Sequence, residues 1–423
     1  MEEMTVSQIK GKRVVYLALS TITLLFLGLI YAFSMFKAPM CDTFNITADA
    51  MGLTFNIMMI VFCFGAVIGS QIEKALGVKP TIIIAAILFA VGFIGTGFCG
   101  YENVTAVYIF YGVIAGAGVG IGYNTIIATT NVWFPDMVGV SSGVLMMGFG
   151  LGALILGNIA LALYGGGSGM DLSTVYLIIG LAGGIIAFIA GLMLRRPPAN
   201  IVELMAPEKT GGSSYDPAED DAALKTPLFY VYWIWAFIVI AVGLATLGFG
   251  ASDGQLAGFD SATAVLLVSI VSAFNGVGRV IVGIIFDKTN VKVTMLIDGI
   301  VAIIATTSIA IALTMQIPAL YAIGALCCGF CYGGVPVVAS AFSRQRFGSK
   351  NYPLNLSLAN FAIVWGSILN LIIQSVLGTG ARVETFIVLI VLAVIATFDV
   401  LPFSKMFNKS QKELDEKRKA ASA

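Results

Sequence analysis

Long apolar runs separated by short polar stretches dominate the chain. Runs of about 20 residues, the length with which an α-helix crosses the hydrocarbon core of a bilayer, recur along it. The pattern predicts an all-α integral membrane protein with twelve transmembrane helices in two six-helix halves. We expect these helices at residues 14–37, 50–71, 80–100, 104–128, 139–164, 173–195, 227–250, 263–285, 292–314, 318–342, 352–377 and 382–403.

A polar segment interrupts the series after the sixth helix. It contains Pro-Pro, Gly-Gly-Ser-Ser and an acidic run, which are typical of a flexible linker. The pattern therefore predicts an N-terminal six-helix bundle at 14–196, a cytoplasmic linker at 197–226, a C-terminal six-helix bundle at 227–403 and a cytoplasmic tail at 404–423.

Composition agrees with a membrane protein and removes several kinds of chemistry. Hydrophobic residues make up 58 % of the 423 positions and charged residues only 11 %, roughly half the charge of a soluble protein. The formal net charge is zero, so no bulk field indicates a nucleic acid as partner. Histidine, the commonest metal ligand and proton relay, is absent.

The six cysteines lie in or beside apolar runs. Cys327, Cys328 and Cys331 are close in sequence, but no second cluster completes a four-ligand metal site. We therefore interpret them as packing residues and expect no metal and no other cofactor. Cys41 and Cys99 lie near the outer ends of predicted helices, which leaves a disulfide between them as an open alternative.

Lysine and arginine are distributed unevenly over the loops. All but three of the 23 Lys and Arg residues fall on one predicted side of the membrane; Lys37 and Arg382 lie toward the other side, and Arg279 lies between. The positive-inside rule then places both termini in the cytoplasm. We expect a multi-pass protein of the cell inner (plasma) membrane.

Arg279 lies deep inside the predicted eighth helix, eight residues before Asp287 and so roughly 12 Å into the membrane. A cation in hydrocarbon costs at least ~2.5–3.5 kcal/mol, so it needs a partner, a watery cavity or a ligand. Ser269, Ser272 and Asn275 share its helix face, and an arginine fork binds a carboxylate bidentately. These residues predict an anion site. The alternative is a structural ion pair, for which Asp298 is the acid of comparable depth.

Polar and aromatic side chains in other predicted helices offer further contacts. For each of them taken singly, hydrogen bonding or packing between helices explains the residue as well as ligand contact does. Trp233 and Trp235 are interpreted as anchors at the membrane interface. The candidate contacts are Tyr31, Ser34, Tyr123, Asn124, Tyr332, Asn355, Asn360, Ser367, Asn370 and Gln374.

Six plus six helices around a long central loop resemble the major facilitator superfamily. Two loops also resemble its gating loops: one carries Asp287 and Lys288 after the eighth helix, and the other carries Glu73 and Lys74 after the second. An acid at a helix end beside basic residues can latch two halves through charge and dipole contacts. We interpret these four as gating residues; the alternative is that they only set the topology.

Longer motifs resemble the oxalate:formate antiporter family over nearly the whole chain. The related monocarboxylate transporters share its single arginine in the eighth helix. The resemblance implies that Arg279 binds the substrate carboxylate and that Tyr31 and Tyr123 line the cavity. The motifs are Gly28-x-x-Tyr31-Ala-x-Ser34 with Pro39, Gly116-Ala-Gly-Val-Gly-Ile-Gly-Tyr123, Asn131-Val-Trp133-Phe-Pro-Asp136, Ser142-Gly143, Gly148-Phe149-Gly-Leu-Gly152 and Phe274-Asn275-Gly276-x-x-Arg279.

Two departures from that family concern the substrate. Phe149 stands where the oxalate transporter has a tyrosine. Ala359 replaces the lysine that pairs with the second carboxylate of oxalate, and its neighbour Asn360 is neutral. A dianion would leave one carboxylate without a charged partner in a low-dielectric site. The departures favour a monocarboxylate such as formate, acetate, lactate or pyruvate.

The sequence thus predicts a secondary active or exchange transporter of small carboxylates that works by alternating access around Arg279. Uniport, proton symport and exchange remain open, with Asp298 as the candidate for a coupling proton. The alternatives are an oxalate or dicarboxylate:formate antiporter and, disfavoured by the short tails, a membrane carboxylate sensor. No nucleophile–base pair indicates an enzyme, and we expect a monomer. The predicted substrate-binding residues are Arg279, Asn275, Tyr31, Tyr123, Asn124, Phe149, Tyr332 and Asn360.

Overall fold

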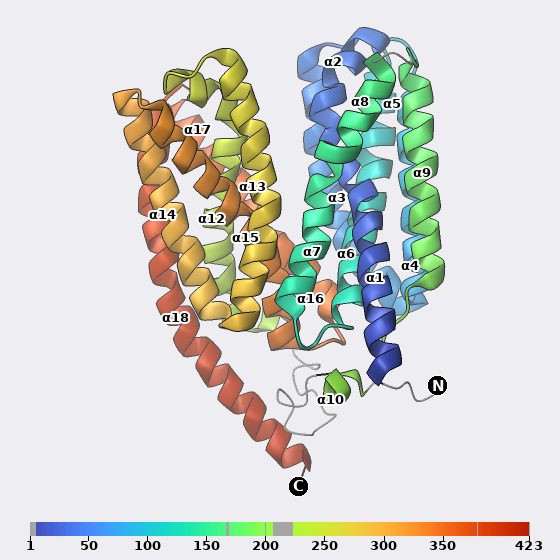
Figure 1. Ribbon diagram of the computed structural model, residues 1–423, viewed down its shortest axis with the longest axis vertical. Helices are drawn as coiled ribbons and strands as arrows, with labels where there is room; N and C mark the ends of the chain where they lie inside the picture. The colour runs from blue at the N-terminus through green and yellow to red at the C-terminus, as the bar shows by residue number, and fades with distance from the viewer. Residues whose placement is uncertain (1–5, 166–168, 199, 206–222, 379, 423) are drawn as a thin grey trace. The chain divides into compact units, whose positions relative to one another are not determined.

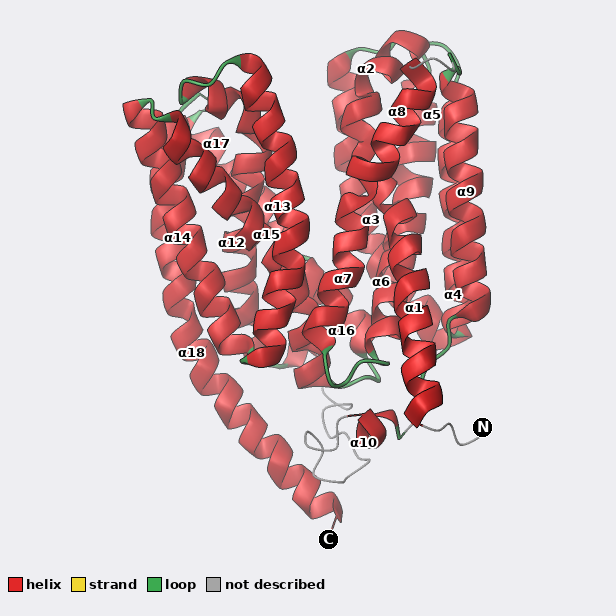
Figure 2. Ribbon diagram, viewed as in Figure 1, coloured by secondary structure: helices red, strands yellow, loops and turns green. Residues whose placement is uncertain are grey.

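The structure is a computed structural model that describes residues 6–165, 169–198, 200–205, 223–378 and 380–422 (Figure 1). Within this part of the chain the regular structure is helical (Figure 2). Twelve helical stretches are long and apolar enough to cross a membrane, which confirms the predicted all-α, twelve-helix fold. The side chains of Ser34 and Ser269 lie outside the described residues.

The chain divides into two compact units. The first comprises Met1–Asp136 and Val144–Thr210, and the second comprises Met137–Gly143 and Gly211–Ala423. The short segment Met137–Gly143 includes the start of helix α7 (Val138–Gly152), so this one helix begins in the second unit and continues in the first.

In the first unit, α4 packs against α9 and α6, and α3 packs against α6. Glycines let these backbones approach closely: a Cβ at Gly120 would lie 2.2 Å from the carbonyl oxygen of Phe62. The elements are α1 (Val6–Leu27), η1 (Gly28–Ala32), α2 (Phe33–Phe44), α3 (Ala48–Leu76), α4 (Val78–Gly97), α5 (Val104–Val107), η2 (Tyr108–Ala115), α6 (Gly116–Asn131), α7, η3 (Ala153–Gly157), α8 (Asn158–Gly165), α9 (Leu172–Met193) and α10 (Ile201–Met205).

In the second unit, α15 packs against both α13 and α14, while α18 packs against α14 and α12. The elements are η5 (Ala223–Lys225), α12 (Pro227–Leu256), α13 (Ser261–Lys288), α14 (Val291–Met315), α15 (Pro318–Phe347), α16 (Tyr352–Asn360), α17 (Ala362–Leu377) and α18 (Arg382–Ser422). Several of them extend past their predicted ends: α15 continues past residue 342, α12 continues past residue 250, and α18 continues through most of the predicted tail.

The predicted helices are less regular than their apolar runs suggest. The first one bends into a 3-10 segment at Gly28–Ala32, and two others contain π-helical turns, Tyr108–Ala115 and Ala153–Gly157. The eleventh is broken between α16 and α17 at Phe361. Such irregular turns often occur at functional sites.

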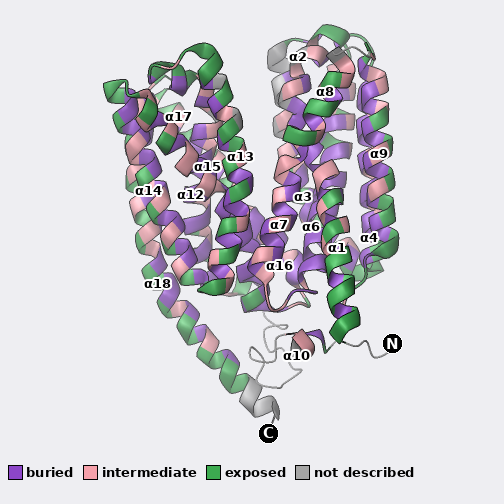
Figure 3. Ribbon diagram, viewed as in Figure 1, coloured by how far each residue is buried: buried purple, intermediate pink, exposed green. Residues whose placement is uncertain are grey.

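Buried and exposed positions alternate around the helices of both units (Figure 3). Many large apolar side chains are exposed, among them Leu371, Val376 and Phe398. An exposed apolar surface of this extent is typical of a surface that contacts lipid. Trp235, by contrast, is fully buried and donates its indole N–H to the Met295 carbonyl oxygen, so its interpretation as an interfacial anchor is wrong.

Candidate functional site

Arg279 and Asn275 lie one turn apart on α13, as predicted. Both side chains are 7 % exposed, and Nε of Arg279 donates a hydrogen bond to Oδ1 of Asn275 at 3.1 Å. This hydrogen bond to a neutral amide orients the guanidinium. An oriented and charged guanidinium can bind a carboxylate.

Close contact between α13 and α15 holds this turn in place. A Cβ at Gly333 would lie 2.2 Å from the backbone oxygen of Asn275, and a Cβ at Gly278 would lie 2.8 Å from that of Phe330. Glycine at both positions brings the two backbones together and fixes the turn that carries Arg279.

The structural ion pair between Arg279 and Asp298 is not formed. Asp298 is buried in α14, and both of its carboxylate oxygens lack a hydrogen-bond partner among the described residues. Ser272, which was predicted to share the polar face of α13, is exposed and donates to the carbonyl oxygen of Val268 in its own helix.

The first unit contributes an aromatic cluster of Tyr31, Phe62, Tyr123 and Phe149. Phe149 lies 5.3 Å from Tyr31 and 4.7 Å from Tyr123 between ring centroids, and Phe62 lies 5.4 Å from Tyr123. The sequence reasoning missed Phe62. The sequence feature that could have indicated Phe62 is its position as an aromatic residue in α3, the helix that packs against the Gly-rich α6.

Gly28 and Gly152 make this cluster geometrically feasible. A Cβ at Gly28 would lie 1.9 Å from the carbonyl oxygen of Phe149, and one at Gly152 would lie 2.3 Å from that of Leu25. Any larger residue would separate η1 from α7. Tyr31 therefore reaches Phe149 because the two backbones touch.

Other candidate contacts have structural partners. The amide nitrogen of Asn124 donates to the Ala66 carbonyl oxygen at 3.4 Å, and that of Asn370 donates to the Ala241 oxygen at 2.8 Å. Asn355 accepts from the backbone nitrogen of Ala223, and Ser367 bonds Ile363 in its own helix. These bonds agree with the helix–helix interpretation.

Residues 359 and 360, where the sequence analysis noted the absence of a second cation, are both uncharged. Ala359 is completely buried in an apolar cluster, and Asn360 is 8 % exposed at the end of α16. Tyr332 of α15 is partly buried and lies against α12 at Gly243. No charged side chain therefore stands at either residue 359 or residue 360.

Asp287 contacts the start of α7 within the second unit. Its two carboxylate oxygens accept hydrogen bonds from the backbone nitrogens of Gly139 at 2.9 Å and Val140 at 2.7 Å. A carboxylate at a helix N-terminus is favoured by both the free N–H groups and the helix dipole. Lys288 is exposed.

The corresponding acid of the first unit has a different partner. Glu73 is 4 % exposed and accepts a hydrogen bond from Arg196 at 2.8 Å, while Lys74 is exposed. The sequence analysis assigned Glu73 to a gating loop and did not identify Arg196, which lies 123 residues further along the chain, as its partner.

A second buried ion pair joins α12 and α18. Nε and one terminal nitrogen of Arg382 each lie 2.7 Å from an oxygen of Asp253, and the guanidinium stacks 4.1 Å from the Phe249 ring centroid. Asp253 is completely buried and Arg382 is 5 % exposed. Arg279 is thus not the only deeply buried cation, and Asp298 is not the only such acid.

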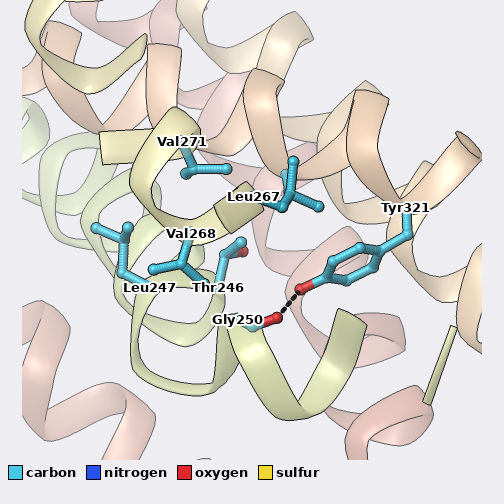
Figure 4. Close-up of a pocket in the computed structure, with 8 residues that line it drawn as sticks. Thr246, Leu247, Gly250, Leu267, Val268, Val271 and Tyr321 are labelled. Carbon is cyan, nitrogen blue, oxygen red and sulfur yellow. Dashed lines mark hydrogen bonds between the residues drawn. The ribbon is translucent and has the colours of Figure 1, made fainter. Parts of the chain in front are cut away.

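A small pocket lies near this end of the second unit (Figure 4). Its walls are apolar apart from Thr246 and Tyr321, and the Tyr321 hydroxyl is already bonded to the carbonyl oxygen of Gly250 at 2.9 Å. None of the predicted substrate contacts lines it. We therefore do not regard it as the substrate site.

The cysteines offer no ligand set. All six are free thiols, so the Cys41–Cys99 disulfide is absent from this structure. Among the described residues no group of three His, Cys, Asp or Glu side chains could hold a metal ion.

Comparison with known proteins supports a transporter. The chain is 26 % identical over 415 residues to the oxalate:formate antiporter of Oxalobacter formigenes, covering 95 % of this chain and 96 % of the relative. It is also 28 % identical to monocarboxylate transporter 1 of Bos taurus, but over only 29 % of this chain and 25 % of that protein.

Solved structures show the same fold. FucP, a major facilitator transporter in an outward conformation, superposes with a TM-score of 0.70 at 14 % identity over 93 % of this chain and 99 % of FucP. The proton:xylose symporter XylE superposes at 0.71 and 16 % identity over 92 % of this chain and 95 % of XylE.

The sequence model of the Major Facilitator Superfamily matches residues 18–371, which is most of the chain. Members of this family are multi-pass membrane transporters and not enzymes. With twelve candidate membrane helices, the matching fold and this coverage, the protein belongs to the major facilitator superfamily.

Proposed function

We propose that the protein transports small monocarboxylates across the plasma membrane by alternating access, with Arg279 binding the carboxylate. The proposal depends mainly on one observation: Arg279 is buried and oriented by the neutral Asn275, and the deep acid Asp298 does not pair with it. We further propose that both termini are cytoplasmic, as the distribution of lysine and arginine indicates.

The charge at residues 359 and 360 supports one carboxylate rather than two. Both residues are neutral, so a second carboxylate would meet no cation there. Asp287 supports a gating role, because its bonds to Gly139 and Val140 are lost if the start of α7 moves away.

A second candidate is exchange of oxalate for formate. The similarity over nearly full length to an antiporter of that name favours it, while the neutral Ala359 and Asn360 disfavour a dianion.

Uptake into proteoliposomes tests the proposal and separates the two candidates. Labelled formate, acetate, lactate and oxalate are supplied with and without internal unlabelled substrate. We expect uptake of monocarboxylates, competition among them and little oxalate uptake. Preference for oxalate would favour the second candidate, and transport of none of the four would refute both.

Arg279→Ala is the decisive variant in the same assay. We expect it to abolish uptake, because nothing else in α13 can bind the carboxylate bidentately. Arg279→Lys should retain little activity, since an ammonium group lacks the planar fork. Ser272→Ala, on an exposed position of the same helix, is the matched control and should transport as the wild type does. Wild-type uptake by the Arg279→Ala variant would refute the assignment.

A further inference from the structure

Asp298 is a buried acid for which the proposed carboxylate site has no use. Its side chain is 1 % exposed, and neither carboxylate oxygen is hydrogen-bonded to any residue that the structure describes. An ionised carboxylate in an apolar interior without a partner is very costly, whereas the neutral acid is not. Burial without a hydrogen-bond partner therefore favours the protonated form of the Asp298 side chain.

Three other helices contribute to the surroundings of this carboxyl group. From α15, Gly334 faces it so closely that an added Cβ would lie 2.8 Å from Oδ2, and the same Cβ would meet Val282 of α13 at 3.0 Å. The titratable groups near the carboxyl are the Cys331 thiol of α15 and the Tyr232 hydroxyl of α12.

No cation is present among these neighbours. The titratable groups that face Asp298 are a phenol and a thiol, both uncharged at neutral pH. α13 presents Val282, and α18 meets the next residue of α14, Gly299, through Thr397; neither side chain titrates. Among the described neighbours only a proton can neutralise this carboxylate.

The Asp298 carboxyl and the turn that carries Arg279 both lie against the same part of α15. Consecutive glycines of α15 make the connection: Gly333 touches the backbone of Asn275, and Gly334 touches the carboxyl of Asp298. No side chain of α15 separates the two at this level. A movement of α13 against α15 when substrate binds will therefore change the space and the solvation around Asp298.

Packing alone does not explain an acid at this position. A leucine or an asparagine would fill a similar volume without the cost of burying a carboxyl group, and ionisable residues inside a membrane are functional as a rule. Glycine at 334 is what leaves room for the carboxyl, since a methyl group there would collide with both of its oxygens.

We propose that Asp298 carries the coupling proton and that the protein moves one proton with each carboxylate. The proton binds the Asp298 carboxylate from water on one side and is released to water on the other, while the anion binds Arg279; no other bond changes. One proton and one monocarboxylate carry no net charge together. This inference rests on the proposed transport of a carboxylate.

Proton and substrate fluxes in proteoliposomes test the proposal. A pH-sensitive dye in the lumen reports protons, exchange of labelled for unlabelled lactate reports the substrate, and protein-free liposomes give the background of passive acid entry. Wild-type protein should acidify the lumen when lactate is added. Asp298→Asn, which imitates the neutral acid, should keep exchange at a rate comparable to wild type and reduce the proton flux to background.

Asp399→Asn is the matched control, since Asp399 is another acid in a predicted membrane segment and is only partly buried. It should keep both fluxes. Substrate-driven proton flux in the Asp298→Asn variant, or wild-type lactate uptake without protons, would overturn the inference. If the wild-type protein shows no lactate exchange, the proposed function itself is overturned.

A measurement on the wild-type protein covers the case in which Asp298→Asn does not fold. Dicyclohexylcarbodiimide, an apolar reagent that enters the bilayer, modifies protonated carboxyl groups. We expect peptide mass spectrometry to locate it on Asp298, less at alkaline than at acidic pH, with proton flux lost in parallel. Absence of the label from Asp298, or labelling that does not depend on pH, would refute the proposal.

Discussion

At the scale of single residues, the contact between Asn275 and Arg279 decides the charge of the proposed site. The amide oxygen lies 3.1 Å from Nε, where a carboxylate would form an internal ion pair. A neutral partner keeps the arginine oriented and adds no negative charge of its own to the site. Asn275 was predicted as a ligand contact; its hydrogen bond with Nε also makes it a positioning residue for Arg279.

Asn275→Asp should convert the anion site into an ion pair. The new carboxylate would compete with substrate for Arg279, so we expect the apparent KM for monocarboxylates to rise by about tenfold or more, as a charge-assisted bond of roughly 1.5–3 kcal/mol implies. Lowering the pH protonates the aspartate and should restore part of the affinity. Initial uptake rates against substrate concentration at several pH values measure the effect.

Asn275→Gln keeps the neutral amide and serves as the control, with a smaller change that does not depend on pH. An unaltered KM in the aspartate variant would show that Asn275 does not share a ligand with Arg279.

At the scale of elements, close backbone contacts position the side chains of each unit. Gly28 lets η1 touch α7 at Phe149, and Gly333 lets α15 touch α13 at Asn275. These contacts are between residues far apart in sequence, so no local pattern reveals which glycine is essential. The sequence alone does not distinguish the glycines that make close backbone contacts from the other glycines in the helices.

Gly28→Ala should disturb the aromatic cluster of the first unit. Its methyl group would lie 1.9 Å from the Phe149 carbonyl oxygen, which requires the backbones to separate; overpacking of this kind typically costs about 1–3 kcal/mol. We expect a lower Tm of the detergent-solubilised protein and reduced uptake. Gly11→Ala in α1, where an added Cβ meets nothing within 4 Å, is the control and should not lower the Tm. Equal Tm values for the two variants would contradict the argument.

The buried pair of Asp253 and Arg382 should act as a structural unit between α12 and α18. Removing one partner leaves an uncompensated buried charge, which costs about 3–5 kcal/mol. We expect Asp253→Ala and Arg382→Ala each to lower the Tm strongly, and the double variant to lower it by clearly less than the sum of both. Thermal unfolding of the wild type, the two single variants and the double variant measures the interaction energy between Asp253 and Arg382. Additive effects on the Tm would refute a structural pair.

At the scale of the whole molecule, α7 is the helix shared by the two units. It begins in the second unit, where Asp287 accepts hydrogen bonds from its first turn, and continues in the first. We expect Asp287→Ala to slow substrate exchange without changing the affinity for substrate. Loss of a helix cap destabilises the conformation that contains the cap by about 1–2 kcal/mol. Ser272→Ala, at an exposed position of the same helix α13, is the control. A changed affinity with an unchanged exchange rate would contradict a gating role.

Much of this protein could be predicted from the sequence because a bilayer imposes strong local rules. Apolar runs of sufficient length indicate the twelve helices, and one arginine in such a run marks the candidate site. Helix ends were predicted less well. Asp253 seemed to be in a loop since it follows an apolar run, yet α12 extends over it to reach Arg382.

The sequence by itself determined the number of spans, the superfamily and the pair of Arg279 and Asn275, because each depends on spacing within one segment. The tertiary structure alone decided which buried charges pair with each other. Asp253 pairs with Arg382 and Glu73 with Arg196, while Asp298 is bonded to none of the described residues. Pairing depends on which helices lie side by side, and hydropathy carries no information about that.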